Sequence, residues 1–136
     1  MVLTLLLHGA IRIADAATPA PGVSAALEQA RTTAPQEKLA YGETAVTDID
    51  AWVKAIDVTL AAAQKTGDTQ RVECLSRRVT PMRVLLEVAR TSRDGLGGHL
   101  GRNEAVQADR EWRKIAVAHG KAAQLRQDAA ACTGSA

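Results

Sequence analysis

Residues 69–100 read TQRVECLSRRVTPMRVLLEVARTSRDGLGGHL, and this stretch decides the fold. Apolar side chains recur along it at alternating spacings of three and four residues, interrupted only at Arg93, which is typical of a helix with one buried stripe. The spacing keeps its phase across Pro81, so we predict that the proline kinks this helix rather than ending it. Asp68 or Thr69 is placed to cap its first turn. The stripe consists of Val72, Leu75, Val79, Met82, Leu86, Ala89, Leu96 and Leu100.

Two further amphipathic helices are predicted, one on either side of this stretch. The earlier helix begins at Thr47, a good N-cap residue, and closes at Gly67, which suits a left-handed cap position. The later helix begins at Asn103, after a glycine-rich segment at residues 95–101 that we predict to be a flexible hairpin turn. Their apolar faces comprise Ile49, Trp52, Val53, Ile56, Leu60 and Ala63 in the first helix and Ala108, Trp112, Ile115, Ala118, Ala122, Leu125, Ala129 and Cys132 in the second.

The predicted fold class is therefore all-α. Three amphipathic helices joined by short turns bury their stripes best as an up-down-up antiparallel bundle, here dominated by a long helical hairpin. The composition agrees, because 27 of the 136 residues are alanine, the best helix former, and phenylalanine is absent. We assign the bundle domain to residues 47–134, preceded by a flexible linker at residues 17–46 that holds three of the four prolines.

The segment 1–16 is interpreted as a signal peptide. It contains a short apolar run at residues 2–7, and Ala14-Asp15-Ala16 has the small-x-small form that a signal peptidase accepts. The basic residues that usually precede such a run are missing, which is consistent with a start codon that lies upstream. The alternative is a short apolar helix that is retained. Cleavage predicts a periplasmic or secreted protein, and the segment is far shorter than a membrane span.

Cys74 and Cys132 are the only cysteines, and an even count in an exported chain predicts that they pair. In an antiparallel hairpin both would lie at its open end. Counted from the glycine-rich turn, however, Cys74 is about six residues nearer than Cys132, roughly 9 Å of helix rise. Fraying of the last helical turn, the kink at Pro81 or an asymmetric turn would have to absorb this difference. Two unrelated buried thiols are the alternative.

The spacing of histidines and serines indicates no catalytic or metal site. His8, His99 and His119 are never three or four residues apart, and neither cysteine has a ligand-spaced partner. Ser76 and Ser92 fall inside the central helix, without the sharp turn that presents a serine nucleophile. We therefore predict no enzymatic activity and no cofactor. The alternatives are a metal site assembled from His99 with Asp or Glu residues elsewhere in the chain, and an enzyme whose site the spacing does not reveal. His119 is expected on a helix face, with its ring bonded to water or backbone.

Basic residues gather in the second half of the chain. Residues 68–136 carry 12 basic and 8 acidic side chains. The two signs are interleaved at helical spacing, as in Glu87–Arg90 and Asp109–Arg113, which is typical of solvated, mutually paired helix faces. This pattern disfavours nucleic acid as a partner. The basic residues of these faces are Arg71, Arg77, Arg78, Arg83, Arg90, Arg93, Arg102, Arg110, Arg113, Lys114 and Lys121.

Part of the chain resembles a known group of proteins. The motif EWRKIAVA at residues 111–118, continuing through LR at 125–126 to ACTG at 131–134, together with VECL at 72–75, is similar to uncharacterised secreted α-helical proteins of myxobacteria-type bacteria. The resemblance covers residues 68–134. It implies a helical fold and export, and it brings no activity and no functional residue.

The leading functional hypothesis is an exported, non-enzymatic helical protein that acts by contact, as a scaffold, an adaptor or an envelope-associated binding module. Its partner would be another protein, a cell-envelope component or a second copy of the chain, met by an apolar or basic face of the hairpin. The alternative is a helical protein that binds nucleic acid or another anion through the Arg-rich faces of residues 71–121.

Cleavage after Ala16 gives the first testable prediction. Mass spectrometry of the protein recovered from its native cell should show an N-terminus at or near Ala17, because the Ala14-Asp15-Ala16 motif directs the peptidase there. A mature protein that still begins with Met1 would contradict export, and with it the oxidising compartment that cysteine pairing requires.

Overall fold

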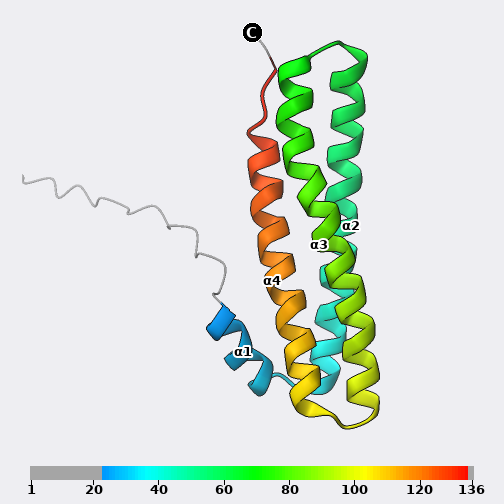
Figure 1. The fold of residues 1–136 in the computed structure, drawn as a ribbon, viewed down its shortest axis with the longest axis vertical. Coiled ribbons are helices and arrows are strands. Elements are labelled where there is room, and N and C mark those ends of the chain that lie inside the picture. Colours follow the sequence, from blue (N-terminus) through cyan, green and yellow to red (C-terminus); the bar gives the residue numbers. More distant parts are fainter. Residues whose placement is uncertain (1–22, 135–136) are drawn as a thin grey trace, which may run out of the picture.

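The computed structural model describes residues 23–134, which form four α-helices (Figure 1). They are α1 (Val23–Thr32), α2 (Pro35–Lys65), α3 (Thr69–Gly101) and α4 (Ala105–Ala130). The described residues contain no strand, so the predicted all-α class is confirmed, with four helices in place of three. The predicted signal peptide and His8 lie outside the described residues.

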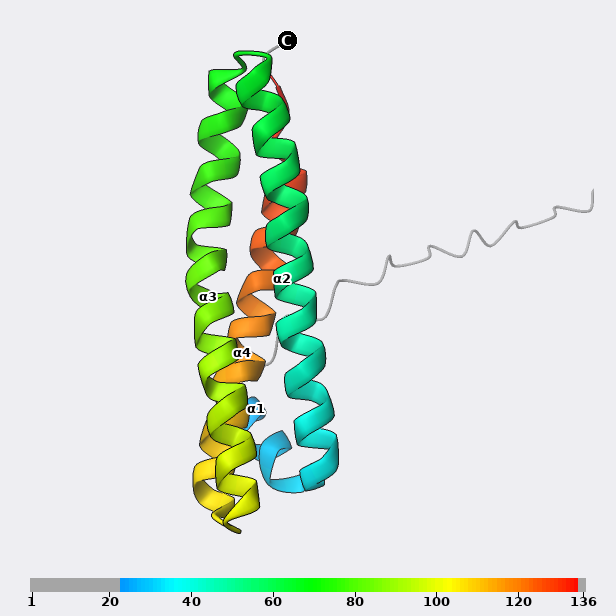
Figure 2. The same ribbon diagram turned by 90° about the vertical axis from the view of Figure 1, so that its right-hand side faces the viewer.

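The three long helices lie side by side, and the chain reverses direction from each to the next (Figures 1 and 2). α2, α3 and α4 each contact the other two, whereas α1 packs against α4. The long helices therefore enclose a common core, and α1 adds a short fourth layer on the outside of α4.

Helix occupies most of residues 17–46, the segment predicted to form a flexible linker. α2 begins at Pro35 rather than at Thr47, and α1 lies wholly inside the predicted linker. Pro35 suits the first position of a helix. Its fixed φ angle is helical, and a backbone N–H at this position would have no acceptor within the helix, so its absence costs nothing. Glu37 supports the same start by accepting a hydrogen bond from the backbone N–H of Ala34, at 3.4 Å. Thr47 is therefore an interior residue of α2 and caps nothing.

Buried side chains form two clusters along the bundle. The larger cluster lies among α2, α3 and α4 and is centred on predicted stripe residues such as Met82. The second lies nearer the α3–α4 turn and joins Leu96 and Trp112 to Ala30 of α1 and Ala45 of α2. Eight of the twenty buried hydrophobic residues are alanine. The helices can therefore approach closely, but each such residue removes little apolar area from water.

α3 continues through the glycine-rich segment at residues 95–101, which corrects the prediction of a flexible turn there. Tertiary packing outweighs the low helix propensity of glycine, because Leu96 is fully buried between the helices. Gly95 also has a packing reason. A Cβ atom at this position would lie 3.3 Å from Cγ of Glu111, so the glycine lets α4 pass close to α3.

The connection between α3 and α4 follows the glycine-rich segment. Asn103 adopts a left-handed φ of 58°, and Glu104, rather than Asn103 as predicted, is the N-cap residue of α4. Asn103 lies midway along the chain between Cys74 and Cys132, so the offset expected between the cysteines is absent. Their Cα atoms lie 5.8 Å apart and their sulfur atoms lie at disulfide distance.

Local predictions for α3 and for the α2–α3 connection that precedes it are confirmed. Asp68 caps the helix by accepting a hydrogen bond from the backbone N–H of Arg71, at 3.1 Å. Gly67 has the left-handed φ of 72° expected after the end of α2. Pro81 lies inside α3 and does not end it, since the helix continues to Gly101; the kink at Pro81 stays a prediction.

The cysteine geometry leads to a second prediction. The protein isolated from its native cell should show no free thiol when unfolded without reductant. Cys74→Ser together with Cys132→Ser should lower the free energy of unfolding by about 4 kcal/mol, because the bond would close a loop with a sequence separation of 58. Thiol titration and thermal melting check this. Two titratable thiols, or a double variant that melts at the wild-type temperature, would contradict it.

Candidate binding surface

The basic faces predicted from the sequence divide into paired and unpaired residues. Arg90 bonds Glu87 at 2.7 Å, as the helical spacing predicts, and also Asp50 of α2 at 2.9 Å. The other paired residues of these faces are Arg77, Arg83, Arg93, Arg102 and Lys114. Within residues 23–134, no carboxylate pairs with the remaining ones, which are Arg71, Arg78, Arg110, Arg113 and Lys121.

The predicted pair between Asp109 and Arg113 is absent, because Asp109 bonds a residue of another helix. Nζ of Lys38, on α2, lies 2.6 Å from the Asp109 carboxylate, and the lysine side chain is only 8% exposed. Removing one member of such a buried pair leaves an unpaired charge, so the contact ties α2 firmly to α4. It also leaves Arg113 without a carboxylate. Lys38 lies in the predicted linker, which is why the sequence pattern did not reveal it.

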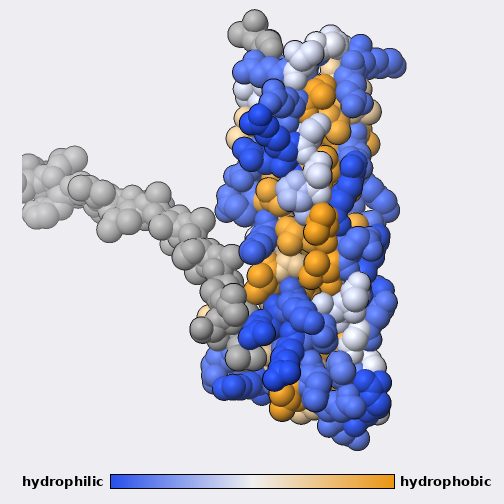
Figure 3. Space-filling model, viewed as in Figure 1, coloured by the Kyte–Doolittle hydropathy of each residue, from blue (hydrophilic) through white to orange (hydrophobic). Residues whose placement is uncertain are grey.

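An apolar groove runs between α3 and α4 on the side of α3 opposite its ion pairs with α2. Figure 3 shows apolar surface along the middle of this face, between hydrophilic flanks. Val84 and Val88 of α3 are 61% and 40% exposed there. Two adjoining hollows of about 470 and 310 Å³ share Leu85 and Lys121. The apolar lining of the two hollows consists of Pro81, Val84, Leu85, Val88, Val117, Ala118 and Leu125.

Basic residues border this groove on the α4 side. Arg113, Lys114 and Lys121 line it together with Gln124, and no acidic side chain is among the lining residues. Lys114 bonds Glu111 at 2.8 Å, whereas Arg113 and Lys121 have no carboxylate partner in the described part of the chain. The groove thus combines an apolar floor with a basic rim on which Arg113 and Lys121 have no carboxylate partner within residues 23–134. This combination fits an amphipathic, negatively charged surface.

His119 lies in a hydrogen-bonded chain that joins α4 to α2. Its Nε2 is 3.1 Å from the Asp48 carboxylate, and its Nδ1 is 3.0 Å from the Tyr41 hydroxyl. When the ring is neutral, Nε2–H donates to Asp48 and the Tyr41 hydroxyl donates to Nδ1. Trp52 stacks on the ring, with centroids 5.3 Å apart and planes at 4°. The expectation that water or backbone satisfies this histidine is therefore wrong, because side chains of α2 do so.

The order carboxylate, imidazole, hydroxyl is also that of a nucleophile triad. Tyr41 and His119 line a cleft of about 480 Å³, together with Trp112. A nucleophile is activated when its pKa is lowered or a base removes its proton, but burial raises the pKa of the Tyr41 hydroxyl, and the charge of Asp48 raises it further. The tyrosine therefore holds its proton more tightly than usual. This favours a structural tie between helices over a catalytic group.

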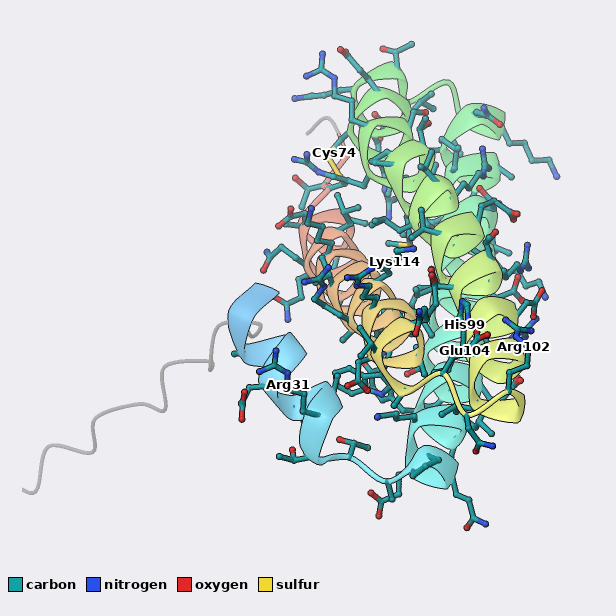
Figure 4. All side chains as sticks on the ribbon, turned by 60° about the horizontal axis from the view of Figure 1, so that its bottom comes forward. Arg31, Cys74, His99, Arg102, Glu104 and Lys114 are labelled. Carbon is teal, nitrogen blue, oxygen red and sulfur yellow. A yellow bond between two sulfur atoms is a disulfide. The ribbon has the colours of Figure 1, made fainter. Side chains whose placement is uncertain are left out.

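A second polar cluster lies at the α3–α4 turn, where Figure 4 shows His99, Arg102 and Glu104 together. The Glu104 carboxylate lies 2.5 Å from Nδ1 of His99 and accepts hydrogen bonds at 3.0 Å from Nε and from a terminal nitrogen of Arg102. These hydrogen bonds lower the pKa of Glu104 from 4.5 to about 2, and the bond from Arg102 makes the largest contribution. The cluster closes one end of the hairpin, and Cys74 lies toward the other end.

The remaining sequence candidates lie in structural positions. Ser76 and Ser92 are both inside α3, where Ser92 is buried in the core. No group of three or more His, Cys, Asp or Glu side chains within residues 23–134 is arranged to hold a metal ion. No helix among the described residues is long and apolar enough to cross a membrane.

No protein-family model, curated protein or solved structure matches this chain. The resemblance of residues 68–134 to secreted myxobacterial proteins therefore stays a prediction.

Glu104 gives a prediction about acid stability. Its pKa is lowered in the folded state, so its bonds stabilise the fold above pH 4.5, and this contribution disappears as the pH falls towards 2. Glu104→Gln should therefore be less stable than wild type at pH 6, and the difference should shrink to nothing near pH 2. Urea unfolding of both proteins from pH 2 to pH 6 measures it. A difference that is the same at both ends of this range would contradict the assignment.

Proposed function

We propose that this protein is an exported, non-enzymatic binding module that engages a partner through the groove between α3 and α4. The observation that carries the proposal is the groove itself, in which exposed valines form one contiguous apolar patch with other apolar residues and no acidic residue is among the lining residues. The working unit is the up-down-up bundle of α2, α3 and α4, which holds the two sides of the groove at a fixed distance.

Export is supported by the placement of the two cysteines. They lie at disulfide distance at the open end of the α3–α4 hairpin, where a bond would hold both walls of the groove together. Such bonds persist in oxidising compartments and are rare in the cytosol. A periplasmic or secreted location therefore fits this arrangement.

The composition of the groove favours a protein or envelope partner over nucleic acid. Only three basic residues border it, whereas a typical DNA-binding face makes roughly 6–10 phosphate contacts. Several other arginines of these faces are already paired with carboxylates. An apolar floor also contributes nothing to phosphate binding.

Charge complementarity favours a different molecule over a second copy of the chain. The rim carries Arg113 and Lys121 without carboxylate partners within residues 23–134, and no acidic residue lines the groove to receive the same rim of a second copy. The expected partner has apolar and acidic groups on one face.

Photo-crosslinking in the native cell envelope tests this proposal. A photoreactive benzoylphenylalanine in place of Val84 should give discrete adducts with another molecule, because Val84 lies in the groove. The matched control is the same substitution at Val58, which is 72% exposed but lies on α2 outside the groove. Lys121→Glu should reduce the Val84 adduct by reversing charge on the rim.

The results that contradict the proposal are equally definite. Equal adducts from positions 58 and 84, adducts only with copies of the same chain, or adducts unaffected by Lys121→Glu would each remove the groove as the partner surface.

A further inference from the structure

A pocket at the cysteine end of the bundle is separate from the α3–α4 groove. It has a volume of about 260 Å³ and lies among all three long helices. Its apolar wall includes Ile56 and Leu75, which are almost completely buried, and the indole ring of Trp52. Cys132 lies at its edge. The complete lining is Trp52, Ala55, Ile56, Thr59, Arg71, Leu75, Arg126, Ala129, Ala130 and Cys132.

Two basic side chains, Arg71 and Arg126, line this pocket, and no acidic residue is among its lining residues. Neither forms an ion pair in the part of the chain that the structure describes. Within the described residues, the Nε atom of Arg71 is buried without a hydrogen-bond acceptor, as are Nε of Arg78 and Nε1 of Trp112, which lie away from this pocket. The pocket has an excess of positive charge beside an apolar wall, which favours an anion with an apolar part.

Arg126 is held in place by a column of stacked side chains. Its guanidinium lies 5.2 Å from the Trp52 ring, and the ring of His119 stacks on Trp52 at 5.3 Å. His119 and Arg126 are two turns apart on α4, about 10.5 Å of helix rise, so the Trp52 ring is intercalated between them. His119 is in turn fixed by its bonds to Asp48 and Tyr41. The hydrogen-bonded chain from Asp48 to Tyr41 thus orients one wall of the pocket.

Arg71 is also fixed by local structure. It belongs to the first turn of α3, where its backbone N–H is bonded to Asp68. One turn further along, Cys74 lies at disulfide distance from Cys132, which places the end of α4 beside Arg71. Stacking on Trp52 therefore positions the Arg126 guanidinium before a ligand arrives, which lowers the entropic cost of binding, and the capped first turn fixes the backbone that carries Arg71.

We propose that this pocket binds a small amphipathic monoanion, with its carboxylate between Arg71 and Arg126 and its hydrocarbon part against Trp52, Ile56 and Leu75. A guanidinium pairs well with a carboxylate, because its planar fork of donors matches the two oxygens. The volume corresponds to roughly nine water-sized groups, which suits a medium-chain carboxylate better than a bare ion or a long lipid. The site is independent of the groove that carries the proposed function.

Octanoate titration followed by NMR tests the proposal. The chain has two tryptophans, and only Trp52 lines the pocket, so the indole N–H signal of Trp52 should shift with saturation while that of Trp112 stays in place. Octanol, which lacks the charge, and inorganic phosphate, which lacks the hydrocarbon, should each bind at least roughly tenfold more weakly.

Matched variants separate binding from folding. Arg71→Gln should weaken octanoate binding by roughly tenfold, the usual effect of losing one hydrogen bond to a charged group, and Arg71→Lys should retain part of it. Arg110→Gln is the control, because Arg110 also lacks a carboxylate partner within residues 23–134 but lies away from the pocket. The unshifted Trp112 signal verifies that each variant is folded.

Several outcomes would overturn the proposal. The alternative is that Arg71 only stabilises the negatively polarised C-terminal end of α4. Arg71→Gln would then lower the melting temperature, and octanoate would shift neither indole signal, even in the wild-type protein. Phosphate as effective as octanoate, or loss of binding in Arg110→Gln, would likewise remove the amphipathic site.

Discussion

The register between α3 and α4 is the constraint on which the rest of the structure depends. Because α3 runs through its glycine-rich end, the turn centres on Asn103, which lies midway between Cys74 and Cys132 in the chain and so brings the two cysteines together. The same register aligns the exposed valines of α3 with the basic residues of α4. A shift of a few residues in the register of α4 against α3 would separate the cysteines, and the valines of α3 would no longer lie beside the basic residues of α4.

α2 joins this hairpin through polar contacts as well as through the core. The Lys38–Asp109 pair and the Asp48–His119 bond each join residues that are 71 positions apart in the chain. A core rich in alanine buries little area per residue, so directional contacts of this kind specify how the third helix docks. The Asp48–His119 bond also bears on binding, because the His119 ring stacks on Trp52, and Trp52 in turn holds Arg126 at the pocket near the cysteines.

The sequence predicted what depends on periodicity and missed what depends on packing between distant residues. The buried stripe around Met82 and the helix start at Asp68 are visible because spacing and capping are local. The early start of α2 is hidden, since its buried positions are small residues such as Ala45. The glycine-rich segment is helical although its composition predicts a turn, because burial of Leu96 outweighs local propensity. The groove and the pocket arise from helix register, which no local pattern encodes.

Amide hydrogen exchange along the end of α3 tests the register most directly. If the helix runs through residues 95–98 as described, the amides of Gly95, Gly97 and Gly98 exchange slowly, like those of the preceding turns, while the amides of Ala105 and Val106, in the uncapped first turn of α4, exchange faster. Fast exchange throughout residues 95–101 would mean that the turn lies in the glycine-rich segment. The register, and with it the groove and the pocket, would then be wrong.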